Sequence, residues 1–214
     1  MTDLNLGGGS ARRGPDGPPP GGLGVIVFVL TVASVIAYGT GSGRWTSFFA
    51  FAASVPLGIY AATTYARLLR LGIRVPGPGI SFFGGISASI LLGISGLLGW
   101  AQAQVAGLPV AVSAFVSELA FALGGVGFAT GLGLLMAGIA VPSVVLRLLP
   151  RWLGWVGLVL GALGEIAFLS LLWSGLDVLL PVVRFGGLIW LAAVGFLLPR
   201  TRHDIPLRER EVAR

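Results

Sequence analysis

The stretch WLGWVGLVLGALGEIAFLSLLW, from Trp152 to Trp173, decides the fold of this chain. It is 22 residues long and contains a single ionisable side chain, that of Glu165. A helix needs about 20 consecutive apolar residues to cross the hydrocarbon core of a bilayer. Tryptophan at both ends of the stretch matches the position of aromatic side chains at membrane–water interfaces. The stretch therefore predicts a transmembrane helix.

Five further apolar segments share this length and composition. With the first they are expected at about residues 23–39, 47–69, 80–102, 112–135, 152–173 and 179–198. Turn-forming glycine, proline and serine residues mark four of the five connections. In the fifth, residues 136–150, Pro142 interrupts an apolar run that either continues the fourth helix with a kink or lies along the interface. We expect an all-α integral membrane bundle of six transmembrane helices.

The overall composition supports a lipid bilayer as the surrounding medium. Of the 214 residues, 55% are hydrophobic and 10% are charged, whereas soluble domains are about 25% charged. The chain has no cysteine or lysine, and its one histidine is His203. These absences exclude thiolate metal sites, a retinal-type Schiff base and a Walker phosphate-binding loop. We expect no cofactor and no bound metal.

The arginines predict how the bundle is oriented. If the N terminus is cytoplasmic, twelve of the fourteen arginines lie on the inner side, and Arg44 and Arg184 lie on the outer side. This bias follows the positive-inside rule, so we expect both termini in the cytoplasm of a bacterial inner membrane. The arginines stand at the ends of apolar runs, so the net charge of +6 does not indicate a nucleic-acid partner.

The two ends of the chain are polar. Residues 1–22 are rich in glycine, proline and charge and are expected to be a disordered cytoplasmic tail. Residues 23–199 form the expected transmembrane domain, and residues 200–214 a basic cytoplasmic tail. Arg12 and Arg13 before an apolar run also resemble a signal peptide, but the run reaches Tyr38 without a clear small-residue cleavage site.

Glycines form a stripe in the fifth segment. Gly157 and Gly161 are four residues apart, and Gly154 and Gly164 extend the same face. Small residues at this spacing let helix backbones approach closely inside a membrane. The stripe is expected either to pack this bundle or to contact a membrane-protein partner or a second copy through Gly157 and Gly161. Gly41, in an expected loop, is expected to tolerate a larger side chain.

Four ionisable residues lie within or beside the apolar segments: Glu118, Glu165, Asp177 and Arg184. At 1.5 Å per residue, Glu165 lies roughly 20 Å beyond Arg151, in the outer half of the bilayer. Arg184 enters from the outer side, so we expect it to meet Glu165 at a similar depth. The cluster is either an ion pair that fixes helix packing or a polar pocket for a solute, lipid headgroup or proton.

Two motifs carry a resemblance to known sequences. The stretch LPRWLGWVGLVLG, residues 149–161, and the stretch RFGGLIW, residues 184–190, resemble uncharacterised multi-pass membrane proteins of GC-rich bacteria, which are grouped under a domain of unknown function. The resemblance covers the last third of the chain best. It implies a multi-pass architecture and brings no activity, ligand or catalytic residue.

Three classes of function remain open. The short loops and few polar residues favour a non-enzymatic accessory, scaffold or lipid-binding subunit. The alternative is a small solute or proton-coupled transporter with a polar site near Glu165 and Arg184. An intramembrane enzyme would need two convergent catalytic groups, for which only Glu118, Glu165 and Asp177 are available as acids or bases.

Overall fold

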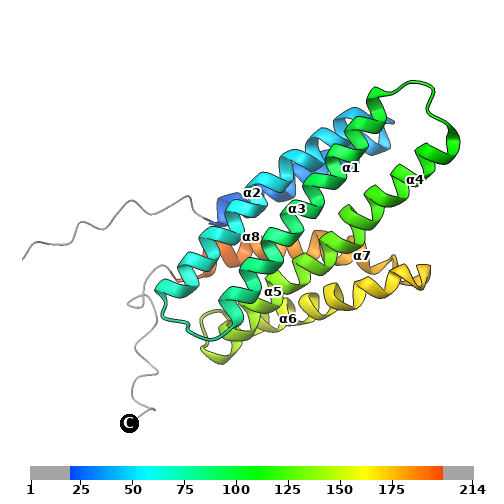
Figure 1. The fold of residues 1–214 in the computed structure, drawn as a ribbon. Helices are drawn as coiled ribbons and strands as arrows, with labels where there is room; N and C mark the ends of the chain where they lie inside the picture. Colours follow the sequence, from blue (N-terminus) through cyan, green and yellow to red (C-terminus); the bar gives the residue numbers. More distant parts are fainter. Residues whose placement is uncertain (1–19, 200–214) are drawn as a thin grey trace, which may run out of the picture.

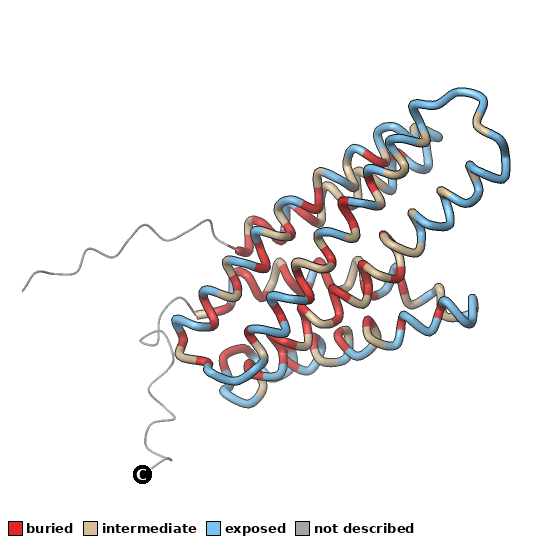
Figure 2. The backbone as a smooth tube through the Cα atoms, viewed as in Figure 1, coloured by how far each residue is buried: buried red, intermediate tan, exposed pale blue. Residues whose placement is uncertain are grey.

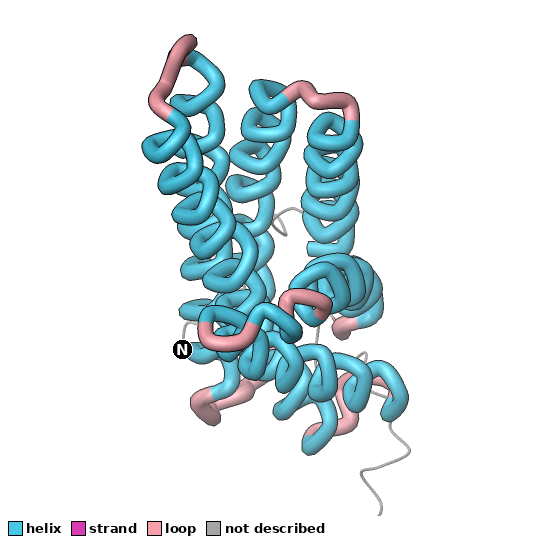
Figure 3. Tube along the Cα trace, turned by 90° about the vertical axis from the view of Figure 1, so that its right-hand side faces the viewer, coloured by secondary structure: helices cyan, strands magenta, loops and turns pink. Residues whose placement is uncertain are grey.

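A computed structural model describes residues 20–199, and this part of the chain contains helices and loops but no strand (Figures 1 and 3). Six helical segments in it are long and apolar enough to span a membrane, as predicted. Their bounds are Pro20–Gly39, Gly43–Arg70, Gly77–Gln104, Val110–Val145, Arg151–Leu171 and Ser174–Leu197. The all-α, six-helix prediction is thereby confirmed for the described residues. Of the predicted tails, the structure describes only residues 20–22, which belong to the first helix and were wrongly assigned to the N-terminal tail; the rest lies outside the described range.

The first three segments are single α-helices. They are α1 (Pro20–Gly39), α2 (Gly43–Arg70) and α3 (Gly77–Gln104). The turn between α1 and α2 contains Gly41 with a φ of +73°. Residues with a Cβ adopt this left-handed conformation at a cost of about 1–2 kcal/mol. The expectation that Gly41 tolerates a larger side chain is therefore wrong, although the space around it is open.

The last three segments combine different kinds of helix. The fourth consists of α4 (Val110–Phe121), a π-helical turn η1 (Ala122–Gly127) and α5 (Phe128–Val145). The fifth joins α6 (Arg151–Ile166) to the 3₁₀ turn η2 (Ala167–Leu171). The sixth runs through η3 (Ser174–Leu176), α7 (Leu179–Pro181), the π-helical turn η4 (Val182–Gly186) and α8 (Gly187–Leu197).

The fourth segment settles the course of residues 136–150. The helix α5 continues through Pro142 to Val145, ten residues beyond the predicted end at Leu135. Of the two predicted courses, the continued helix is the correct one. The hydroxyl of Ser143 donates a hydrogen bond of 2.7 Å to the carbonyl oxygen of Ile139. A short loop then leads to α6, which begins directly after Pro150.

The six segments pack as a ring in chain order. The main contacts join α1 to α2, α2 to α3, α3 to α5 and α5 to α6, and α8 closes the ring against α1. Short connections make consecutive segments antiparallel. In Figure 1, α6 and α8 run at an angle to α1, α2 and α3. The helix α4 has fewer neighbours than α5, because the main contacts of α4 are with α3 and η1 only.

Burial is uneven along the bundle. Tyr60, Phe128 and Met136 are among the large side chains that are fully buried. The hydroxyl of Tyr60 donates to the carbonyl oxygen of Leu191 over 2.8 Å and thereby joins α2 to α8. In contrast, α4 has no buried residue. Figure 2 shows this contrast: the tube is largely red around α5 and largely pale blue along α4.

The predicted glycine stripe packs within the chain. Gly157 lies against the indole of Trp190 on α8, and Gly161 lies against Ala137 on α5. A Cβ on Gly164 would lie 2.7 Å from the Cα of Gly133, so the two backbones touch there. The face that carries Gly157 and Gly161 is therefore covered by this chain's own helices.

Arg67 ties the end of α2 to the end of α8. Its side chain is buried, with 8% of its surface exposed. The guanidinium Nη1 donates to the carbonyl oxygens of Gly195 and Leu198, at 3.3 Å and 3.2 Å. The last carbonyls of a helix have no partner within the helix, so Arg67 supplies hydrogen bonds that α8 lacks at its C-terminal end.

Candidate functional site

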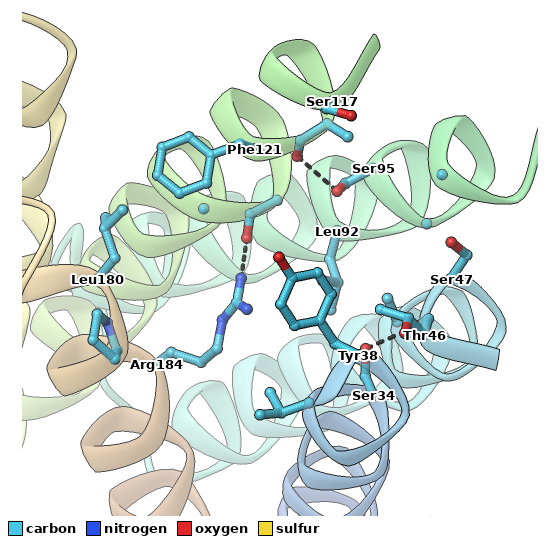
Figure 4. Close-up of a pocket in the computed structure, with 18 of the residues that line it drawn as sticks. Ser34, Tyr38, Thr46, Ser47, Leu92, Ser95, Ser117, Phe121, Leu180 and Arg184 are labelled. Atoms are coloured by element: carbon cyan, nitrogen blue, oxygen red, sulfur yellow. Dashed lines mark hydrogen bonds between the residues drawn. The ribbon is translucent and has the colours of Figure 1, made fainter. Parts of the chain in front are cut away.

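A cavity of about 730 Å³ lies between the first three helices, the fourth segment and the start of the sixth (Figure 4). Its walls are mixed in character, with apolar residues such as Leu92, Phe121 and Leu180 beside many polar ones. The polar and charged lining residues are Ser34, Tyr38, Thr46, Ser47, Ser95, Gln102, Ser117, Glu118, Asp177 and Arg184. Tyr38 and Glu118 are themselves exposed, so the cavity opens to the outside of the bundle.

Four glycines line the cavity: Gly96 and Gly99 on α3, and Gly124 and Gly125 of η1. Three of them lie where helices approach closely, since a Cβ on Gly96, Gly99 or Gly124 would meet Phe51, Ser47 or Ser95. These glycines therefore let α3 pack against α2 and η1 beside the cavity. Beyond η1, α4 buries no residue.

Arg184 extends from η4 to the base of the cavity. Its Nη2 donates a hydrogen bond to the carbonyl oxygen of Gly124, which Figure 4 shows as a dashed line. Its Cζ lies 4.9 Å from the centroid of the Phe128 ring, a cation–π contact. Among the residues that the structure describes, it has no carboxylate partner. A guanidinium has five N–H donors, so most of its capacity is unused.

The guanidinium lies deep in the bundle. Gly124 is 14 residues from the start of the 36-residue segment Val110–Val145, roughly 21 Å along the helix axis. Beyond this level the core is closed, since Leu132, Leu135 and Met136 are fully buried. The cavity therefore reaches from one end of the bundle to about its middle and ends at Arg184.

Two π-helical turns meet at this point. Gly124 belongs to η1 and Arg184 to η4. A π turn bonds residue i to i+5, which is rare in proteins and frequent at functional sites. Both turns went unpredicted from the sequence. The only signal was the paired glycines in each region, Gly124-Gly125 and Gly186-Gly187, and such pairs also occur in ordinary helices.

Hydroxyl and amide groups on the cavity wall are held by hydrogen bonds. Ser34 donates to the carbonyl oxygen of Thr46 at 2.8 Å, and Ser95 to that of Ala120 at 2.7 Å. At the open end of the cavity, Nε2 of Gln102 donates to the hydroxyl of Ser113 at 2.8 Å and to that of Ser117 at 3.1 Å. These bonds join α1 to α2 and α3 to the fourth segment. They were not predicted, because serine is common in helices and carries no specific signal there.

Three of the four predicted site residues line the cavity: Glu118, Asp177 and Arg184. Glu165 does not line it. The Oε1 atom of Glu165 is buried without a hydrogen-bond partner. The predicted pair of Glu165 with Arg184 is therefore not formed in the structure.

The reason is the rotation of α6 rather than its depth. A Cβ on Gly186 would lie 3.2 Å from Leu160, so the side of α6 that faces η4 is the side of Leu160. Glu165 follows Leu160 by five residues, which places it about 140° further around the helix axis. Its neighbour Gly164 packs on Gly133 of α5 instead. Two residues at one depth need not share a face.

The double substitution Glu165→Leu with Arg184→Leu tests this placement. We expect the losses of thermal stability in detergent to add within about 0.5 kcal/mol, as they do for sites without shared partners. Unfolding of the two single variants and the double variant measures the coupling. Recovery of most of the stability in the double variant would show that the side chains meet and that α6 presents a different face to η4.

The described residues contain no group of three or more His, Cys, Asp or Glu that could hold a metal ion. His203 lies outside the described range. No family model matches this chain, and no curated protein and no solved structure matches it either. The resemblance to uncharacterised multi-pass membrane proteins therefore stays a prediction.

Proposed function

We propose that this chain is an integral protein of a bacterial inner membrane and crosses it six times, with both termini in the cytoplasm. Six long apolar helices support the crossing. Arginines support the orientation, because those of the described residues that lie near connections gather at one end of the bundle. Arg67, Arg70, Arg74, Arg147 and Arg151 flank the connections after α2 and α5, whereas Arg44 follows α1. The cavity then opens toward the outer side.

Within the membrane, we propose that the protein binds a lipid in this cavity and acts as a non-enzymatic accessory subunit. The observation that carries the proposal is a guanidinium without a carboxylate partner among the described residues, held at the base of a partly apolar cavity. Placing an arginine at the centre of a membrane helix costs at least about 2.5–3.5 kcal/mol. An intramembrane charge retained at such a cost indicates a functional site.

The size and walls of the cavity suit an amphiphile. Ligand pockets typically measure about 300–1,000 Å³, and this one measures about 730 Å³. Leu92, Phe121 and Leu180 offer contacts for acyl chains, and the charged residues offer contacts for a headgroup. A lipid enters such a cavity directly from the bilayer, because its rim includes exposed residues of α1 and α4.

The hydrogen bonds of the wall support a non-enzymatic role. A serine nucleophile must be activated by a neighbouring base. Ser34 and Ser95 donate to backbone carbonyl oxygens instead, which fixes their hydroxyl protons in structural bonds.

The depth of the cavity favours a transporter as the second candidate. A route for a solute would begin at the outer end and reach Arg184 about halfway through the bundle. It would have to continue past Leu132, Leu135 and Met136, which are fully buried. Transport would therefore need a second conformation in which the inner half opens.

Filling the cavity tests lipid binding. We expect Ala120→Trp to lose most of the phospholipid that co-purifies with the protein, because Ala120 lines the cavity and an indole would occupy its space. Native mass spectrometry of protein released from nanodiscs measures the bound lipid. The matched control is Val112→Trp, at an exposed position of the same helix outside the lining. Equal lipid content in both variants and the wild type would contradict the proposal.

A further inference from the structure

We propose that the cavity selects a zwitterionic headgroup, with its phosphate on Arg184 and its ammonium group near Glu118 and Asp177. This inference rests on the proposed lipid-binding function and names the chemical class of the lipid. It arises from charges of opposite sign that line one cavity at different levels.

Arg184 supplies the anion site at the base. Arginine binds phosphate through two parallel N–H···O bonds, and such charge-assisted bonds are about twice as strong as neutral ones. One N–H of Arg184 is committed to the carbonyl oxygen of Gly124, and the Cζ atom lies over the Phe128 ring. These two contacts fix the guanidinium in position and leave other donors for an incoming phosphate.

The two carboxylates supply the cation site nearer the opening of the cavity. Glu118 precedes Gly124 by six residues, and Asp177 precedes Arg184 by seven. Measured along its own segment at an α-helical rise, Glu118 lies about 9 Å from Gly124, and Asp177 lies about 10.5 Å from Arg184. A phosphate hydrogen-bonded to Arg184, a two-carbon linker and an ammonium group together bridge a separation of this order.

The sum of the charges argues against an anionic headgroup. With one arginine and two carboxylates, the lining residues carry a formal charge of −1. A headgroup with phosphate alone would gain from Arg184 but would meet two like charges on its way in, and like charges repel. A headgroup that also carries an ammonium group is attracted by Arg184 through its phosphate and by the two carboxylates through its ammonium. The hydroxyl of Tyr38, which points into the same space in Figure 4, adds a polar neighbour.

The test compares headgroups on the purified full-length protein. Thermal unfolding in detergent is followed while phosphatidylethanolamine, phosphatidylglycerol, diacylglycerol or water-soluble phosphoethanolamine is added. We expect phosphatidylethanolamine to bind most tightly. Arg184→Gln, which removes the charge and keeps a polar side chain, should weaken its binding roughly 10- to 100-fold, as the loss of a charge-assisted hydrogen bond implies. Arg184→Lys, which keeps the charge, should fall between.

The decisive variant is Glu118→Gln with Asp177→Asn. Glu118 is exposed, Asp177 is half-buried, and each replacement is close in size to the original residue, so the fold should persist. The preference for phosphatidylethanolamine over phosphatidylglycerol should fall by roughly threefold to tenfold, the size expected for two solvent-accessible charge pairs. An unchanged preference, or tighter binding of phosphatidylglycerol by the wild type, would overturn the headgroup inference and leave lipid binding intact. Binding of no lipid would overturn the proposed function. If phosphoethanolamine binds as tightly as the lipid, the headgroup chemistry is supported, but the proposal that the ligand is a lipid is overturned.

Discussion

Replacing Gly84 with leucine is expected to prevent the bundle from folding into its native packing. Gly84 lies where α3 crosses α5 with the two backbones in contact. A Cβ at this position would lie 2.6 Å from the amide nitrogen of Leu135 and 2.7 Å from the carbonyl oxygen of Gly131. Overpacking typically costs about 1–3 kcal/mol even where side chains can shift. Here the obstacle is backbone, so we expect a loss of about 3 kcal/mol or more.

Gly79 offers a matched control on the same helix. It is exposed, and a Cβ added to it would meet no atom within 4 Å, so Gly79→Leu should be tolerated. The yield of monodisperse protein and its unfolding temperature in detergent measure both variants. Similar stability for Gly84→Leu and Gly79→Leu would show that α3 and α5 do not cross where the structure places them.

The second large loss of stability is expected from the substitution Arg67→Leu. The substitution keeps most of the apolar volume but removes the donor to the carbonyl oxygens of Gly195 and Leu198. Hydrogen bonds from charged groups contribute about 1.5–3 kcal/mol each, so losing both should cost about 3 kcal/mol or more. The last turn of α8 should open more often, and hydrogen exchange of its amides should accelerate.

The control for this variant is Arg74→Leu. Arg74 lies in the connection after α2 and is exposed. Surface substitutions usually change stability by about 0.5 kcal/mol, so a much smaller loss is expected. If both variants lose the same stability, the loss is explained by the removal of positive charge at this end of the bundle. The hydrogen bonds to α8 would then not be its cause.

Much of the fold could be predicted from the sequence because bilayer thickness limits helix length. The expected segment 152–173 overlaps the observed Arg151–Leu171 closely. The fourth segment was the least well predicted, since a proline usually breaks a helix. In this case Pro142 lies near the end of α5, and the helix ends only three residues later.

The candidate site was predicted in part. Ionisable residues in apolar segments are few, so Glu118, Asp177 and Arg184 could be found directly. Their partners could not be found, because a helical period gives the face of a residue only relative to its own helix. A π turn such as η4 adds a residue to one turn and so rotates every later side chain. The pairing of Arg184 with a backbone carbonyl leaves no trace in the sequence.

The π turn η1 also has a mechanical consequence. It joins α5, which is anchored in the core, to α4, which buries no residue. The 12 residues of α4 form a lever about 18 Å long. A bend of about 10° at η1 would move the tip of this lever by about 3 Å. It would disturb no buried side chain of α4, but it would stretch the hydrogen bonds from Gln102 to Ser113 and Ser117. The width of the opening is thus set by this joint together with the bonds of Gln102, and the carbonyl oxygen of Gly124, which holds Arg184, lies at the joint.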